Sequence, residues 1–241
     1  MAYVGGKAKG SQFIIDILNH DIFDGLPYIE PFVGYGHILR RIEDKKSYRA
    51  YDNHPLLITL MKGIQDGKRI PHISKQQYEK LKKSKEISFK RAVACFTYSY
   101  NGKEWGGYTP TDSTGQYNYV QQRTNYYKKL RHNDTFMRTK FTVKDYRKLK
   151  PKESLVYCDP PYHGTTGYGK NEFDHTEFWD MMRKWSKNNI VFISEYKAPK
   201  DFKCVGFAKK HSTLSGSPER SVRKEKLFLH NSLYSILKDF L

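Results

Sequence analysis

The strongest constraint on the fold is a four-residue apolar run, Leu155-Val156-Tyr157-Cys158, that ends at Asp159-Pro160-Pro161-Tyr162. An apolar run without polar alternation predicts a strand buried on both faces, which is typical of the interior of a parallel sheet. Ligands of open α/β sheets bind at the carboxyl ends of such strands, so this turn is the first candidate site.

Strand and helix patterns alternate on either side of this run, which favours an α/β fold with a mostly parallel, doubly wound sheet. Further strands are predicted at 28–29, 48–51, 141–143, 190–193 and 225–230, the last preceded by a polar segment at 211–224. Helical spacing predicts helices at 13–18, at 38–42 after a pair of glycines, and over 179–185 with Thr176 as the cap.

Residues 61–140 have a different character, with charged, aromatic and glycine-rich stretches. Within them we expect a loop or hairpin at 101–119 and a basic helix at 121–131. The sequence therefore predicts a catalytic domain made of 1–60 and 141–241, with 61–140 as an inserted lobe.

The chain of 241 residues carries a formal net charge of +18, and aromatic residues make up 15% of it. Cations interleaved with stacking platforms favour a nucleic-acid partner over a merely soluble basic protein. The three cysteines form no closely spaced pair and there is no HExxH, so no disulfide, zinc or other metal site is predicted. No targeting segment or membrane-length apolar run is found, so we expect an intracellular, cytoplasmic protein with no membrane partner, in a bacterium or a phage-infected cell.

A second candidate site follows the first predicted strand, at Glu30-Pro31-Phe32-Val33-Gly34-Tyr35-Gly36. Glycines let a backbone approach a ligand closely, although a tight turn would also explain them. Leu39 takes the place of the third glycine in a dinucleotide fingerprint, which argues against a dehydrogenase. Asp52 ends the next strand and could accept both hydroxyls of a ribose; a helix cap shared with Asn53 is the alternative.

The Asp159 motif suits methylation of an aromatic amine, a poor nucleophile because its lone pair is delocalised into the ring. A carboxylate and the free carbonyl beside a proline can accept the two N–H groups and direct the lone pair at a methyl donor. Tyr162 could stack on a base turned out of its duplex. An ordinary strand-to-loop turn is the alternative for the motif, and a core tyrosine is the alternative for Tyr162.

Taken together, these motifs resemble the Dam-type (D12 class) DNA adenine-N6 methyltransferases, including phage-borne relatives. The resemblance spans nearly the whole chain and includes an N-terminal Tyr3-Val4-Gly5-Gly6-Lys7. It continues through Gly164-Thr165-Thr166-Gly167-Tyr168, Phe173-Asp174-His175, Ile193-Ser194-Glu195-Tyr196 and Glu225-Lys226-Leu227-Phe228.

The resemblance implies a Rossmann-like class I methyltransferase sheet with an antiparallel last strand, in which the inserted lobe recognises the target. It implies S-adenosylmethionine as cofactor and double-stranded DNA, with the target adenine flipped out, as partner of a monomer or weak dimer. The implied catalytic residues are Asp159, Pro160 and Tyr162. The implied cofactor contacts are Tyr3, Lys7, Glu30, Pro31, Phe32, Gly34, Gly36, Asp52 and Asp159, although Lys7 could be one more surface lysine. Tyr146 flanks the cofactor adenine in this interpretation, or else packs in the core.

The inserted lobe departs from the family pattern just after Asn101-Gly102. Dam proper usually has an arginine there, whereas this chain has Glu104 and Trp105, so the target need not be GATC. Basic residues predicted to contact DNA, or else to be plain solvated charges, are Arg123, Lys128, Lys129, Arg220, Arg223 and Lys224.

Other functions remain open at this point. An RNA adenine is one alternative substrate. Cytosine N4 is another, although enzymes of that group usually have Ser in place of Asp159. An inactive nucleic-acid-binding protein on a methyltransferase fold is a third, against which the intact motifs argue.

Overall fold

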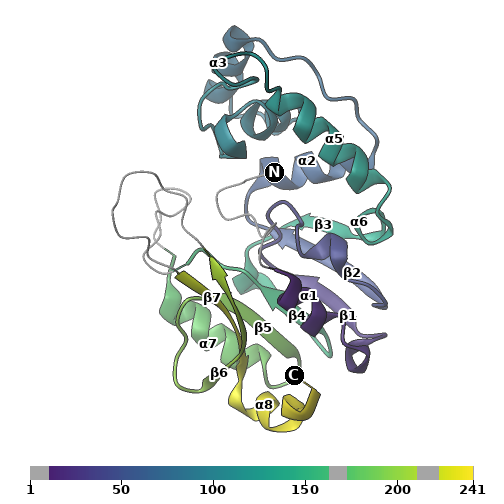
Figure 1. Ribbon diagram of the computed structural model, residues 1–241, viewed down its shortest axis with the longest axis vertical. Helices are drawn as coiled ribbons and strands as arrows, with labels where there is room; N and C mark the ends of the chain where they lie inside the picture. Colours follow the sequence, from purple (N-terminus) through teal and green to yellow (C-terminus); the bar gives the residue numbers. More distant parts are fainter. Residues whose placement is uncertain (1–10, 163–172, 211–222, 241) are drawn as a thin grey trace.

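The structure, a computed structural model, describes residues 11–162, 173–210 and 223–240. Within them the strands form a seven-stranded sheet of order β3-β2-β1-β4-β5-β7-β6 (Figure 1). The parallel strands are β1 (Pro27–Glu30), β2 (Ser47–Asp52), β3 (Lys140–Val143), β4 (Leu155–Cys158) and β5 (Ile190–Glu195). The remaining two are β6 (Phe202–Lys210) and β7 (Arg223–His230), and β7 runs antiparallel to both β5 and β6.

The order of the strands reverses between β1 and β4. From β1 the chain proceeds outwards through β2 to β3, and then returns to the centre at β4. Such a reversal leaves a crevice at the carboxyl ends of the two central strands, where ligands of doubly wound sheets bind. The predicted mostly parallel sheet with an antiparallel last strand is confirmed.

Both faces of the sheet are covered, which explains the continuous apolar run in β4. Leu155 and Tyr157 belong to one core cluster, whereas Val156 and Cys158 belong to the other. Helix α7 (His175–Trp185) packs on the second face through four buried side chains: Phe178, Trp179, Met182 and Trp185. The first cluster includes buried side chains of α1 (Gln12–Leu18) and α2 (Pro55–Gln65).

Helices dominate the segment between β2 and β3, and Figure 1 shows α3 and α5 at the opposite end of the molecule from α8. After α2 come α3 (Lys75–Lys83), α4 (Phe89–Ala92), η3 (Val93–Thr97), η4 (Tyr100–Gly102), α5 (Tyr119–Arg131) and α6 (Asp134–Arg138). A Cβ at Gly63 would lie 2.1 Å from Cδ2 of Phe89, so this glycine permits the close contact between α2 and α4. The remaining elements are η1 (Asp21–Phe23), η2 (Leu39–Arg41), η5 (Tyr146–Lys148), α8 (Asn231–Leu237) and η6 (Lys238–Phe240).

The helix predicted at 38–42 is wrong, because only the single turn η2 forms there. The carbonyl oxygens that would continue a helix accept hydrogen bonds from distant side chains instead. Asn133 donates to the carbonyl of Arg40 at 2.8 Å, and Thr135 donates to that of Ile42 at 2.6 Å. These bonds come from the segment 133–135, far along the chain, so local spacing could not predict them.

Two further details differ from the sequence prediction. Asp174, not Thr176, caps α7, since its carboxylate accepts the N–H of Glu177 at 2.9 Å. Strand β6 was not predicted: it is a mixed polar edge strand with a register shift at Gly206, where a Cβ would lie 2.9 Å from Phe13. No helix in the described residues is long and apolar enough to cross a lipid bilayer.

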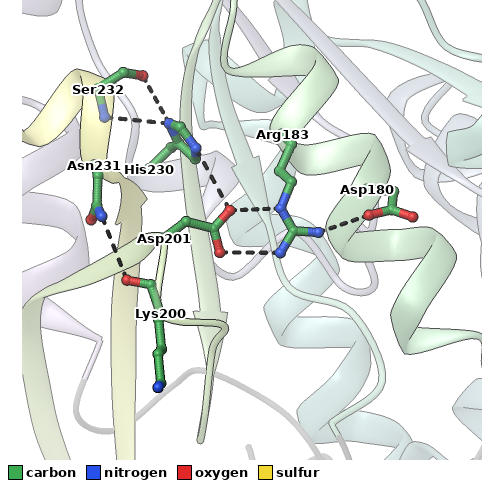
Figure 2. A network of polar contacts seen from close by, with 7 residues as sticks. All are labelled: Asp180, Arg183, Lys200, Asp201, His230, Asn231 and Ser232. Carbon is green, nitrogen blue, oxygen red and sulfur yellow. Dashed lines mark hydrogen bonds and ion pairs between the residues drawn. The ribbon is translucent and has the colours of Figure 1, made fainter.

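A polar network ties α7 to the start of β6 and the end of β7 (Figure 2). The Arg183 guanidinium donates two hydrogen bonds to Asp201, at 2.6 and 3.1 Å, and a third to Asp180 at 2.7 Å. The Nε2 of His230 lies 3.7 Å from the same Asp201 carboxylate, and its Nδ1 accepts the N–H of Ser232 as the cap of α8. A bidentate pair of this kind fixes orientation better than a single contact.

Replacing Arg183 with Ala should lower the free energy of unfolding by about 1 kcal/mol, because the side chains of the pair with Asp201 are 37% and 36% exposed and well oriented. The measurement is urea unfolding followed by circular dichroism. Lys184→Ala, which removes an exposed neighbouring cation, is the control, and equal losses in the two variants would contradict the role given to this network.

Candidate active site at the switch point

The two candidate motifs lie side by side although they are far apart in sequence. Strands β1 and β4 pair in parallel, with Tyr28 opposite Leu155 and Ile29 opposite Val156. The residues after β1 and those after β4 therefore leave the same edge of the sheet at its switch point. This placement brings the Glu30 to Gly36 loop and Asp159 to the same edge of the sheet.

Asp52 joins the glycine loop to the end of β2. One carboxylate oxygen accepts the N–H of Gly34 at 3.2 Å, and the other accepts the N–H of His54 at 2.9 Å. Burial raises the pKa of the Asp52 carboxyl, and these backbone hydrogen bonds oppose the shift. The helix cap expected as the alternative belongs to His54, whose Nδ1 accepts the N–H of Leu57.

The loop leaves room for a ligand beside its backbone. Gly34 and Gly36 have positive φ values of 51° and 65°, and a Cβ at Gly34 would meet nothing within 4 Å. A carboxylate offers about four lone-pair sites in all, so Asp52 can accept further hydrogen bonds beside those from the backbone. A ribose with two vicinal hydroxyls, next to an open backbone, fits these groups.

The other residues of the loop are more enclosed. Glu30 is 2% exposed and accepts a hydrogen bond from the Tyr28 hydroxyl at 2.8 Å, and Pro31 is buried. The centre of the Phe32 ring lies 5.1 Å from the centre of the Tyr146 ring and 5.9 Å from that of the Phe178 ring. Tyr146 is itself buried in this aromatic cluster, so packing accounts for its position.

Asp159 and Pro160 follow β4, and the nearby Tyr162 side chain is held by two other strands. Its hydroxyl donates to Oε1 of Glu225 in β7 at 2.9 Å, and its ring lies 4.7 Å from that of Tyr196, just after β5. Burial and the charge of Asp159 raise the pKa of Tyr162. Asp159 itself remains partly exposed.

Sequence reasoning missed two buried acids near this turn. Glu195 and Glu225 are each 2% exposed, and both lie in strands of the central sheet. Carboxylates are rarely buried without partners. The position of these two glutamates, one at the start of a predicted strand and one just after another, was the sequence feature that could have marked them as functional candidates. Both stood in motifs of the family resemblance but received no role.

Several predicted residues fall outside the described part of the chain: Tyr3, Lys7, Arg220 and the motif at 164–168. Arg223 and Lys224 lie at the start of β7, where the backbone register sets them opposite Lys210 and Lys209 of β6. Four basic positions thus meet at one end of the β6–β7 pair.

The structure does not place Arg123 where the sequence predicted. It is 5% exposed, its guanidinium donates to the carbonyl of Thr97, and it lies over the ring of Tyr119. Because the carbonyl of Thr97 is buried with it, this arginine serves the packing of the helices and not a surface contact. Lys128 and Lys129, on the last turn of α5, are exposed.

The strand order and the ligand edge at the switch point define a class I methyltransferase fold. Residues 3–204 match the family described as D12 class N6 adenine-specific DNA methyltransferase. The chain belongs to this family, and it is a methyltransferase that uses S-adenosylmethionine as methyl donor.

Solved structures with a similar course of the chain are distant in sequence. The rRNA methyltransferase aviRa from Streptomyces viridochromogenes is 11% identical, with a TM-score of 0.45 over 98% of this chain and 91% of that one. An rRNA methylase from Streptococcus thermophilus is 9% identical, with a TM-score of 0.42 over 92% and 96%. No curated protein sequence matches the chain.

The glycine loop also contacts the helical segment. The Tyr35 hydroxyl donates to the carbonyl of Gly102 at 3.1 Å, and the Tyr126 hydroxyl lies 3.4 Å from Nδ1 of His37. Burial, with a smaller contribution from the charge of Arg40, lowers the pKa of His37 from 6.5 to about 4. His37 is therefore neutral near pH 7.

Acid should destabilise the protein through His37. Between pH 6.5 and 4 the unfolded chain binds a proton at this position that the folded chain does not, so the free energy of unfolding falls as the pH falls. From pH 7 to pH 5 this contribution is on the order of 1–2 kcal/mol. Urea unfolding measures the free energy of unfolding at pH 7 and pH 5, and the difference between the two values should be smaller for His37→Gln than for the wild type. His132→Gln, at an exposed position, should leave the difference unchanged; a wild-type difference retained in His37→Gln would refute the assignment.

Proposed function

We propose that this methyltransferase modifies the N6 amine of adenine in double-stranded DNA, with the target base flipped out of the duplex. The observation that carries the proposal is the position of Asp159: it follows β4 at the switch point, at the sheet edge from which the glycine loop leaves β1 and at which Asp52 ends β2. Membership of the D12 class family supports the same substrate.

The proposed roles of the residues follow from what the amine needs. The Asp159 carboxylate and the Pro160 carbonyl accept its two N–H groups, which directs the nitrogen lone pair away from the ring. S-adenosylmethionine, when bound, supplies a methyl group on a positively charged sulfur. The nitrogen gives up one proton as the product forms, and the Asp159 carboxylate is the group offered to accept it. The Tyr162 ring supports the flipped base by stacking.

The cofactor is proposed to lie along the glycine loop. The Asp52 oxygens accept the ribose hydroxyls, and Glu30, Pro31, Phe32, Gly34 and Gly36 form the wall next to the methionine part. Tyr3 and Lys7 complete this set in the proposal. The open space at Gly34 supports this arrangement.

Nucleic acid is proposed to contact the insert 61–140, which recognises the target, and the basic end of the β6–β7 pair. The contacts assigned here are Lys128, Lys129, Arg220, Arg223 and Lys224. The net charge of +18 supports a polyanionic partner. A cytoplasmic setting, in which the free Cys95, Cys158 and Cys204 stay reduced, is part of the same proposal.

Asp159→Ala should lower the rate of methyl transfer by at least about 100-fold, because the amine loses the group that activates it. The wild type and the variant are compared with tritiated S-adenosylmethionine on unmethylated genomic DNA and, in parallel, on total RNA. Mass spectrometry identifies the product nucleoside, expected to be N6-methyldeoxyadenosine. Glu43→Ala, at an exposed position, should retain full activity. Near-normal turnover in Asp159→Ala, or label found only in RNA, would refute the proposal.

Tyr162→Ala should weaken binding of DNA containing the target adenine about tenfold or more, since base stacking contributes on the order of 1–3 kcal/mol. Cofactor affinity should change much less. Tyr162→Phe, which keeps the ring but loses the hydrogen bond to Glu225, should lie between the wild type and Tyr162→Ala. Fluorescence anisotropy measures DNA binding and calorimetry measures cofactor binding; equal losses of both would argue against stacking.

A further inference from the structure

Glu104 is one of the two residues at which the insert departs from the family pattern, and its carboxylate has a partner, His54, next to Asp52. Oε1 of Glu104 lies 3.1 Å from Nε2 of His54. This contact joins the loop after η4 to the residue that caps α2. The hydrogen bond to His54 lowers the pKa of Glu104, so the carboxylate is charged at neutral pH.

The two ring nitrogens of His54 have different partners, which indicates the tautomer of the neutral ring. Nδ1 accepts the N–H of Leu57 at 3.3 Å, so in the neutral ring Nε2 carries the hydrogen and donates to Glu104. Phe96 packs against the same ring, with centroids 5.2 Å apart. The ring is thereby fixed by three contacts, of which two come from the insert.

His54 in turn holds Asp52. Its backbone N–H donates to one oxygen of the Asp52 carboxylate at 2.9 Å, while Gly34 donates to the other oxygen. Fixing the His54 ring fixes the start of α2, and with it the direction of this N–H. A chain of contacts therefore runs from Glu104 through His54 to Asp52.

The loop that carries Glu104 is itself held firmly. Asn101 and Trp105 adopt positive φ values of 50° and 46°, which non-glycine residues rarely do. The N–H of Trp105 donates to the carbonyl of Cys95 at 3.3 Å, and the Arg91 guanidinium lies 5.3 Å from the centre of its indole ring. Such a loop cannot easily shift to restore a lost contact.

We propose that Glu104 is a positioning residue for the cofactor: through His54 it orients Asp52, and so links the insert to cofactor affinity. This inference rests on the cofactor site proposed above. Glu104 is not one of the proposed cofactor contacts, and within the described ranges 11–162, 173–210 and 223–240 its link to Asp52 runs through His54. Nucleic acid that alters the loop after η4 should therefore also alter cofactor affinity. By thermodynamic linkage, cofactor binding then changes the affinity for that nucleic acid by the same factor.

The test is calorimetry of S-adenosylmethionine binding to the full chain without nucleic acid, followed by steady-state kinetics on DNA. Glu104→Ala should raise the Kd and the KM for the cofactor about three- to tenfold, the loss expected for one hydrogen bond, and leave kcat at saturating cofactor nearly unchanged. Glu104→Gln keeps an acceptor for Nε2–H and should restore most of the affinity. Thermal unfolding of each variant shows whether the fold is kept.

Glu86→Ala is the matched control, because it removes an exposed glutamate from the same insert and should leave cofactor binding unchanged. An unchanged Kd in Glu104→Ala, or an equal rise in Glu86→Ala, overturns the inference while the proposed function stands. Failure of Glu104→Gln to restore affinity in a folded protein also overturns it. A wild type that binds no S-adenosylmethionine would instead overturn the proposed cofactor site, and the inference with it.

Discussion

The pair of hydrogen bonds that Asp52 accepts from Gly34 and His54 is the contact on which the site depends. A carboxylate drawn partly out of water is costly unless its oxygens are satisfied, and backbone N–H groups from two different segments meet that need at Asp52. The same two bonds set the course of the chain after β1 and the start of α2. Helix α2 in turn packs closely on α4 through Gly63. The Asp52 carboxylate therefore also helps to fix the helical segment between β2 and β3 to the sheet.

Sequence patterns predicted the central strands well because their signal is local. A strand covered on both faces must be apolar at every position. Strand β4 and most of β5 meet this requirement. Edge strand β6 lacks that signal, since Lys203, Cys204 and Phe207 are exposed and Gly206 interrupts its pattern. The missing helix at 38–42 had the right spacing, but side chains distant in sequence occupy its carbonyl groups.

For the candidate site, the sequence predicted which strand ends lie at one edge of the sheet but not how their side chains are held. Parallel strands end at one edge, so Asp159 and the glycine loop could be brought together from their order alone. Arg123 was misjudged because a helix pattern does not tell a buried arginine from an exposed one when a carbonyl such as that of Thr97 satisfies it. The partnerships of Tyr162 with Glu225 and of His54 with Glu104 join distant segments, and only the folded chain shows them.

The hydrogen bond from Tyr162 to Glu225 also has a consequence for the order of events on the ribosome. Strand β7 is the last strand in sequence, yet it lies between β5 and β6 in the sheet. During translation Tyr162 leaves the exit tunnel well before Glu225, so the growing chain carries the whole Asp159 turn before the carboxylate that accepts the Tyr162 hydroxyl is made. A polypeptide released before β7 is made has every residue of the Asp159 motif, but not the bond that orients its tyrosine.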